Sequence, residues 1–309
     1  MKAFRNFAFV STVTSYLLIF TGGLVRVSGA GLGCPDWPKC FGRWLPPLGV
    51  SQLPTDVDPS TFNFALAWIE YLNRLFGMLL GLLVVVTAIL AIIHYRRVLR
   101  ILLPTLIAAL CVAFAGWQGG KVVTSHLEPL SVSFHLIVAL AVVTLLTYVT
   151  QQAYYLDKGM MAHSGSADRT HVWIALLWLV TIIQILLGTH VRASLEKLAI
   201  TFPLDNDLAL IAKSGGTKYI HMIFGIFMAI LTFQVAHQVL RLGGRALPLM
   251  RVAVWSIMSL MVVQLLLGTG LLVIGIPPLL QVFHLWVAAL LIGTILYLYS
   301  AVRVEVKPS

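Results

Sequence analysis

The sequence predicts an all-α integral membrane protein whose eight transmembrane helices form two four-helix bundles related by a pseudo-two-fold axis along the membrane normal. Of its 309 residues, 59% are hydrophobic and 10% are charged, whereas a soluble domain has about 45–50% apolar and about 25% charged residues. Its mean hydropathy is +0.94. Eight apolar stretches are long enough to cross a bilayer, and motifs of the first half recur in the second.

Each of the eight stretches provides the roughly 20 apolar residues that a membrane-spanning helix needs. The predicted spans lie near 7–27, 65–93, 101–123, 131–152, 171–191, 217–240, 251–274 and 279–301. The first span is interpreted as a helix rather than a cleavable signal peptide, because it has no A-x-A-like cleavage site and seven more spans follow.

Basic residues gather in the short loops on one side of the predicted membrane. Arg96, Arg97 and Arg100 share one such loop, and Arg241 and Arg245 share another. By the positive-inside rule, we expect both termini in the cytoplasm of a multi-pass protein of the inner (plasma) membrane. Because the net charge of +10 is spread over loops at the helix ends, we expect the lipid bilayer and no nucleic acid as a partner.

Three motifs of the first half recur in the second half. The first two recur at offsets of 148 and 149 residues, and a third, weaker one recurs at 166. The matching pairs are 70–77 with 218–225, 134–136 with 283–285, and 22–26 with 188–192. Because each half has an even number of helices, both repeats enter the membrane in the same direction. We therefore predict an N-terminal half, 1–155, and a C-terminal half, 156–309, with a polar linker near their boundary.

Three histidines lie inside predicted spans at a similar depth. His135, His221 and His284 are each about five residues from the outer end of their helix, and ionisable groups within spans tend to be functional. His221 and His284 belong to the same half, and two imidazoles that face each other in a helix bundle make a bis-histidine haem site. The alternative for each is a buried histidine satisfied by a neighbouring carbonyl group, or an interfacial one.

Two arginines lie at the same outer level as these histidines. Arg192 ends the fifth span and Arg26 ends the first. Arginine is well suited to the carboxylates of haem propionates, so both are candidate propionate ligands. Snorkelling of the side chains to the lipid headgroups is the alternative.

The first half lacks the second imidazole. Asn73 stands where the second half has its first histidine, so a haem ligated by His135 would keep an open iron position, which oxygen chemistry requires. Glu70 lies one helical turn before Asn73 on the same face, and its counterpart in the repeat is Lys218. The two halves therefore look specialised, one for electron transfer and one for reaction. The alternative for Glu70 is an interfacial charge paired with Arg74.

Two of the three cysteines, Cys34 and Cys40, share the first outer loop. The outer side of a cell membrane is oxidising, which favours a disulfide between them. A metal or redox pair is the alternative, although the spacing fits neither a C-x-x-C motif nor a usual zinc knuckle. Cys111 lies inside a span and is expected to be an inert buried thiol.

These residues resemble the haem A synthase family over nearly the whole chain. The resemblance rests on Gly-Gly-Leu-Val-Arg, Gly-x-Gly-Cys-Pro-Asp-Trp-Pro-x-Cys, Glu-x-x-Asn-Arg, Gln-Gly and three histidines. These motifs occupy 22–26, 31–40, 70–74, 118–119, and positions 135, 221 and 284. The family usually has histidine where this chain has Asn73, and some members carry a second outer cysteine pair that this chain lacks.

The resemblance implies an enzyme that oxidises the C8 methyl group of haem O to a formyl group, which gives haem A for cytochrome oxidase. It implies a haem B cofactor whose iron is held by His221 and His284, with Arg192 near its propionates. It makes Glu70 the catalytic carboxylate and pairs the outer cysteines, Cys34 and Cys40. The residues assigned to the substrate haem are His135, on its iron, with Asn73, Arg74 and Arg26.

Candidate partners implied by the family are haem O synthase, cytochrome oxidase assembly factors and an electron donor that the sequence does not identify. The lipid-facing surface and the family allow a homo-oligomer. Two other functions fit parts of the sequence. A two-haem electron-transfer cytochrome fits the pair His221 and His284 but not the one-sided Glu70, and a haem chaperone or transporter fits the parallel repeat.

Overall fold

The computed structural model describes residues 1–162, 169–241 and 248–305. Within these ranges, eight helices are long and apolar enough to cross a membrane, and each coincides with a predicted span. They are α1 (Lys2–Val27), α2 (Phe64–Tyr95), α3 (Leu99–Thr124), α4 (Pro129–Asp157), α5 (Thr170–Thr201), α7 (Thr217–Arg241), α8 (Pro248–Val273) and α9 (Pro278–Val302). The prediction of an all-helical, multi-pass membrane protein is confirmed. Arg245, used above to predict orientation, lies outside the described residues.

Shorter elements connect these helices. The outer loop between α1 and α2 contains three 3₁₀ turns, η1 (Ala30–Leu32), η2 (Val50–Gln52) and η3 (Pro59–Thr61). The short helix α6 (Asp207–Lys213) lies between α5 and α7. Two short strands, β1 (Met161–Ala162) and β2 (Val304–Glu305), pair antiparallel.

Side chains at the helix starts explain where several helices begin. The Asn63 side chain accepts a hydrogen bond from the Leu66 N–H at 3.1 Å and caps α2. Asn206 caps α6 in the same way, through the Ala209 N–H at 2.9 Å. The helix α9 begins directly after Pro277, with a proline at its first position.

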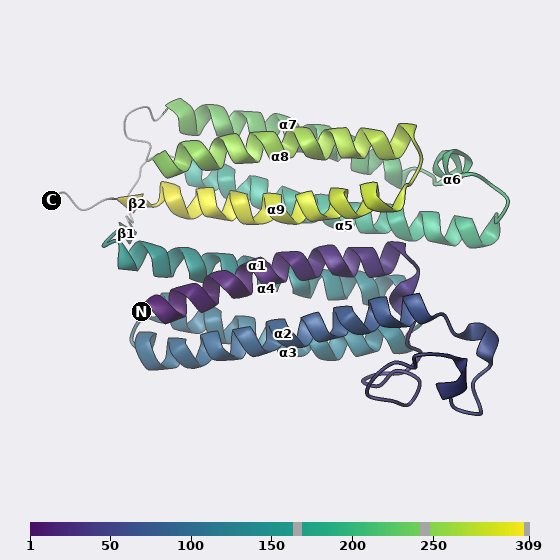
Figure 1. The fold of residues 1–309 in the computed structure, drawn as a ribbon. Helices are drawn as coiled ribbons and strands as arrows, with labels where there is room; N and C mark the ends of the chain where they lie inside the picture. The colour runs from purple at the N-terminus through teal and green to yellow at the C-terminus, as the bar shows by residue number, and fades with distance from the viewer. Residues whose placement is uncertain (163–168, 242–247, 306–309) are drawn as a thin grey trace. The chain divides into compact units, whose positions relative to one another are not determined.

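The chain divides into two compact units, Met1–Leu146 and Thr147–Ser309. In unit 1 the long helices run alongside one another (Figure 1) and share a buried cluster to which α2, α3 and α4 contribute, with Leu18 of α1 packed against it. The cluster consists of Leu80, Val84, Ala108, Val142 and Leu146. A second cluster under the outer loop joins the cysteines to α2 through Ala67.

In unit 2 the helices α5, α7, α8 and α9 share one larger buried cluster. Its fully buried members include Ile174, Leu177, Val239, Leu291, Ile295, Leu298 and Ala301. The last turns of α4 belong to this unit, and there the Gln151 amide donates to the Tyr297 carbonyl at 2.8 Å. Large apolar side chains such as Leu110 and Leu266, 71% and 68% exposed, point outward, as expected for helices surrounded by lipid.

Candidate functional site

The two histidines of unit 2 face each other from α7 and α9. The ring centroids of His221 and His284 are 6.3 Å apart, and the ring planes differ by 69°. Two imidazoles on opposite sides of one metal, with bonds of about 2.0–2.1 Å, have centroids about 6 Å apart. The observed separation therefore fits one metal between the two rings.

A glycine on a neighbouring helix supports each ring. A Cβ atom added to Gly188 of α5 would lie 3.1 Å from Cε1 of His221, and one added to Gly268 of α8 would lie 3.2 Å from Cε1 of His284. Within the described residues, the Nδ1 atoms of both histidines are buried without a hydrogen-bond partner. The rings are thus held by packing against the glycines, and their Nδ1 atoms have no hydrogen-bond partner among the described residues.

The pair of imidazoles suits haem better than a bare ion. In the part of the chain that the structure describes, no group of three or more His, Cys, Asp or Glu side chains is placed to hold a metal ion. Two trans imidazoles complete the coordination of an iron whose other four ligands come from a porphyrin. The residues present therefore fit a haem.

Two glutamines next to the histidines were not identified from the sequence. The Gln184 amide donates to the His221 carbonyl at 2.8 Å, and Nε2 of Gln264 lies 3.3 Å from Nε2 of His284. The signal that could have found them is the string Gln-x-x-x-Gly-Thr, which occurs at 184–189 and again at 264–269.

Arg192 lies one helical turn beyond Gly188, the glycine of α5 that contacts the His221 ring. Its Nε donates to Oε1 of Glu196 at 2.8 Å, and its Nη1 donates to Oε1 of Gln281, three residues before His284 on α9. The guanidinium is therefore fixed next to the histidine helix. Its predicted role as a propionate ligand is not tested by these contacts.

His135 occupies the corresponding place in unit 1, but without a facing imidazole. A Cβ added to Gly119 of α3 would lie 3.6 Å from Cε1 of His135. Its Nδ1 is buried and unpaired within the described residues. Asn73 accepts a hydrogen bond from Thr21 of α1 at 2.9 Å. In the described chain, no hydrogen bond joins His135 to Asn73 or Glu70.

The first outer loop is closed by the predicted disulfide, Cys34–Cys40, with an S–S distance of 2.02 Å. It sits directly on α2, because a Cβ added to Gly33 would lie 2.4 Å from the Leu66 carbonyl oxygen. It also reaches α3, where the Trp37 ring lies so close to Gly120 that an added Cβ would come within 2.7 Å. Gly120 directly follows Gly119, the glycine that contacts His135, so the loop and the histidine pack on the same turn of α3.

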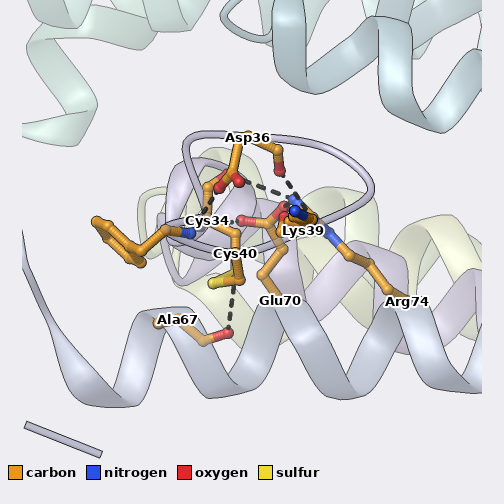
Figure 2. Close-up of polar contacts among 8 residues, drawn as sticks. Cys34, Asp36, Lys39, Cys40, Ala67, Glu70 and Arg74 are labelled. Atoms are coloured by element: carbon orange, nitrogen blue, oxygen red, sulfur yellow. Dashed lines mark hydrogen bonds and ion pairs between the residues drawn. A yellow bond between two sulfur atoms is a disulfide. The ribbon is translucent and has the colours of Figure 1, made fainter. Parts of the chain in front are cut away.

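Glu70 and Arg74 fasten this loop to α2 (Figure 2). One carboxylate oxygen of Glu70 accepts from the Cys34 N–H at 2.7 Å, and the other is paired with the guanidinium of Arg74. Arg74 also donates to the carbonyls of Asp36 and Lys39, at 3.0 and 2.8 Å. Glu70 is only 4% exposed. The ion-pair alternative is thus observed, and both carboxylate oxygens are occupied.

Lys218, the counterpart of Glu70 in the repeat, also holds a neighbouring backbone segment, but with a positive charge. Lys218 is buried, and its ammonium group donates to the Ile211 and Ala212 carbonyls at the end of α6. The acid at this position binds a loop N–H group, and the base binds carbonyl groups at the end of α6. Arg26, the remaining predicted site residue, lies in the last turn of α1.

The chain matches, over residues 5–296, the family described as COX15-CtaA, cytochrome oxidase assembly protein. This match covers most of the chain, so the protein belongs to that family. A protein named "Heme A synthase" from Wolbachia sp. subsp. Brugia malayi (strain TRS) is 23% identical over 95% of each chain. Another of that name, from Shewanella oneidensis, is 28% identical over 93% of this chain and 92% of its own.

Proposed function

We propose that the protein is a haem A synthase, which oxidises the C8 methyl group of haem O to the formyl group of haem A. The observation that carries the proposal is the asymmetry between the units. Two imidazoles face each other in unit 2, whereas Asn73 takes the matching place in unit 1. A site with one imidazole leaves an iron position open for chemistry, and a site with two suits electron transfer. Family membership and the names of the relatives support the same activity.

His221 and His284 are proposed to hold a haem B cofactor by its iron. A haem B bound there would carry electrons for the oxidation. Gly188 and Gly268 leave room for the two rings to approach from their helices. Arg192, held in place by its neighbours, would pair with a propionate group at the outer end of the site.

His135 is proposed to bind the iron of the substrate haem. Asn73 accepts a hydrogen bond from Thr21 of α1, so its side-chain oxygen is already bound to a protein donor. Among the described residues, unit 1 would then supply the iron with His135 alone. Arg26 and Arg74 supply positive charge at the outer level of the same unit. Trp37 covers the helix next to His135 and so would help exclude water from the reacting group.

Glu70 is proposed to serve the reaction in two ways. In the observed geometry it fixes the disulfide loop, and hence Trp37, against unit 1. The predicted catalytic role requires one carboxylate oxygen to leave Cys34 or Arg74 when the substrate binds, so that it can accept a proton from the group being oxidised.

The two units are proposed to be parallel repeats, each a four-helix bundle, related by an axis along the membrane normal. Both termini would then face the cytoplasm of the inner membrane, as the basic loops predict, and the histidines would lie near the outer surface. Haem O synthase and cytochrome oxidase assembly factors are the proposed partners for delivery and use of the haems. The lipid-facing surface allows a homo-oligomer.

The test is the haem content of the purified protein. We would express the full chain in cells that also make haem O, extract the haems in acid, and identify them by chromatography and mass. Haem B together with haem O, haem A or a hydroxylated intermediate is the expected result. Two haem B per chain and nothing else would instead identify a two-haem electron-transfer cytochrome, and the synthase proposal would fail.

A further inference from the structure

Each unit has a groove on its surface, and the two grooves lie at matching positions of the repeat. A groove of about 280 Å³ lies between α3 and α4 in unit 1, and one of about 680 Å³ lies between α8 and α9 in unit 2. At the repeat offset of 149, four lining residues of one correspond to four of the other. The pairs are Ile107 with Ser256, Leu110 with Ser259, Cys111 with Leu260, and Ala141 with Leu290.

The two grooves differ in polarity. The unit 1 groove is lined throughout by apolar side chains and the Cys111 thiol. In the unit 2 groove, two of the four matching positions carry Ser256 and Ser259 in place of apolar side chains, and the other two carry leucines. Thr294 and Arg251 add further polar groups. The same fold position is therefore wholly apolar only in the half that contains His135.

The two grooves also differ in where they begin. The unit 1 groove reaches Ile137 and Val138, two and three residues from His135 on α4. At 1.5 Å per residue this is about 3–5 Å along the helix. The unit 2 groove comes no closer to His284 than Leu290, six residues away, which is about 9 Å.

Aromatic contacts make the wall of the unit 1 groove continuous with the surroundings of His135. The rings of Phe114, in the groove, and Phe134, next to His135 in sequence, are in edge-to-face contact at 5.9 Å. Gly119, five residues beyond Phe114 on α3, contacts the imidazole itself. An apolar chain attached to a haem on His135 could therefore enter the groove directly.

We propose that the groove between α3 and α4 binds the isoprenoid chain of the haem O substrate. The inference rests on the proposed function. Haem O differs from haem B in carrying a long, branched, apolar hydroxyethylfarnesyl chain. The wholly apolar groove that reaches α4 within two residues of His135 matches this chain. The groove of unit 2 has polar side chains among its apolar ones, and it belongs to the half proposed for haem B, which has no such chain.

The groove selects the isoprenoid chain over membrane lipid because the chain is covalently attached to a bound haem, and not because of the hydrophobic effect. Lipid tails are as apolar as the groove, so transfer from the bilayer brings little hydrophobic gain. The isoprenoid chain, however, is attached to a ring ligated by His135, which gives it a high effective concentration at the groove.

The groove gives the reaction its positional selectivity. A porphyrin held by one imidazole can rotate about the iron–nitrogen bond, and its several methyl groups would then exchange places. A chain seated between α3 and α4 permits one rotation of the ring. The C8 methyl group is thereby held in one position for reaction.

The Cys111 thiol provides a direct test without any mutation. The chain has three cysteines, and two form the disulfide, so Cys111 is its single thiol. We would load the detergent-purified protein with haem B, then measure by mass the rate of Cys111 alkylation by an apolar maleimide, with added haem O or further haem B. We expect haem O to slow alkylation about tenfold and haem B to leave it unchanged. Equal rates with the two haems would overturn the proposal.

A matched pair of substitutions tests the same groove in turnover. Ala141→Leu introduces the side chain that unit 2 has at Leu290, and Leu290→Ala makes the reverse change in the other groove. One methylene in an apolar pocket changes discrimination by about 10–200-fold. We therefore expect Ala141→Leu to raise KM for haem O about tenfold with normal haem B content, and Leu290→Ala to leave KM unchanged. An unchanged KM in Ala141→Leu would contradict the inference.

These experiments separate the inference from the proposed function. If the wild-type protein makes haem A but haem O does not protect Cys111, the groove assignment is wrong and the function stands. If no haem A is formed, the function fails, while the alkylation rates still report whether the chain occupies the groove.

Discussion

Replacing Glu70 by glutamine removes the negative charge that fastens the disulfide loop to α2. The carboxylate accepts from the Cys34 N–H at 2.7 Å and pairs with Arg74, and it is 4% exposed. A glutamine keeps one oxygen acceptor but turns an NH₂ group toward a second donor. Breaking a buried ion pair costs about 3–5 kcal/mol, and an unsatisfied buried donor costs about 1–3 kcal/mol. We expect Glu70→Gln to weaken loop docking by about 2–4 kcal/mol, an interval centred on the value at which these two ranges meet.

Such a change is measurable as local opening. Since 1.36 kcal/mol corresponds to a factor of ten, amide hydrogen exchange in segment 31–40 should accelerate about 30- to 900-fold. Reduction of Cys34–Cys40 by a water-soluble phosphine should accelerate in parallel. The protein would be studied as the full chain in lipid nanodiscs, with haem A formation measured on the same samples.

Two comparisons identify the role of Glu70. Lys218→Met removes the equivalent anchor in unit 2 and should leave exchange in segment 31–40 unchanged. Arg74→Gln disturbs the loop while keeping the carboxylate, so equal losses of haem A formation in Arg74→Gln and Glu70→Gln indicate positioning. Exchange within twofold of wild type in Glu70→Gln would refute the anchoring argument, and a loss of turnover in that protein would then favour direct chemistry.

Further substitutions test the packing around the histidines and the loop. Gly188→Ala places a Cβ 3.1 Å from the His221 ring, and because overpacking costs about 1–3 kcal/mol, we expect less haem B in the purified protein by acid extraction. Gly22→Ala, at the matching position with nothing within 4 Å, should retain haem B and its melting temperature; a similar loss in both would contradict the packing argument. Asn73→His should give the absorption spectrum of a six-coordinate low-spin iron with haem O bound, and an unchanged spectrum would count against ligation in unit 1. Gly33→Ala, with its Cβ 2.4 Å from a backbone oxygen, should prevent docking of the loop and make the disulfide rapidly reducible, whereas wild-type reduction rates would show that the loop adapts.

Helix positions were largely predictable because the bilayer imposes a length on each apolar run. All eight spans appear among the described residues. The end of α5 was not predicted, since the helix continues to Thr201, ten residues beyond the expected boundary. Its last turns are polar and carry the Arg192–Glu196 pair at helical spacing. Hydropathy detects where lipid requires a helix, but not where a helix continues into water.

The histidine sites were predictable in depth but not in their supports. The predicted ends of the spans placed His221 and His284 at one level, and the structure brings their ring centroids to 6.3 Å. The glycines that contact the rings and the two glutamines beside the histidines lie on other helices, and side-chain partners across helices depend on rotation and tilt. The sequence signal for them was the string Gln-x-x-x-Gly-Thr, which begins once at Gln184 and again at Gln264.

The sequence by itself determined the membrane class, the eight spans, the repeat and the cysteine pair, because hydropathy, period and the number of available cysteines are local properties of the chain. Only the tertiary structure decided that Glu70 binds the backbone of a loop residue 36 positions away, and that an apolar groove reaches α4 within two residues of His135. The physical reason is that a partner or a groove is made by segments distant in sequence, whose meeting depends on how the helices pack.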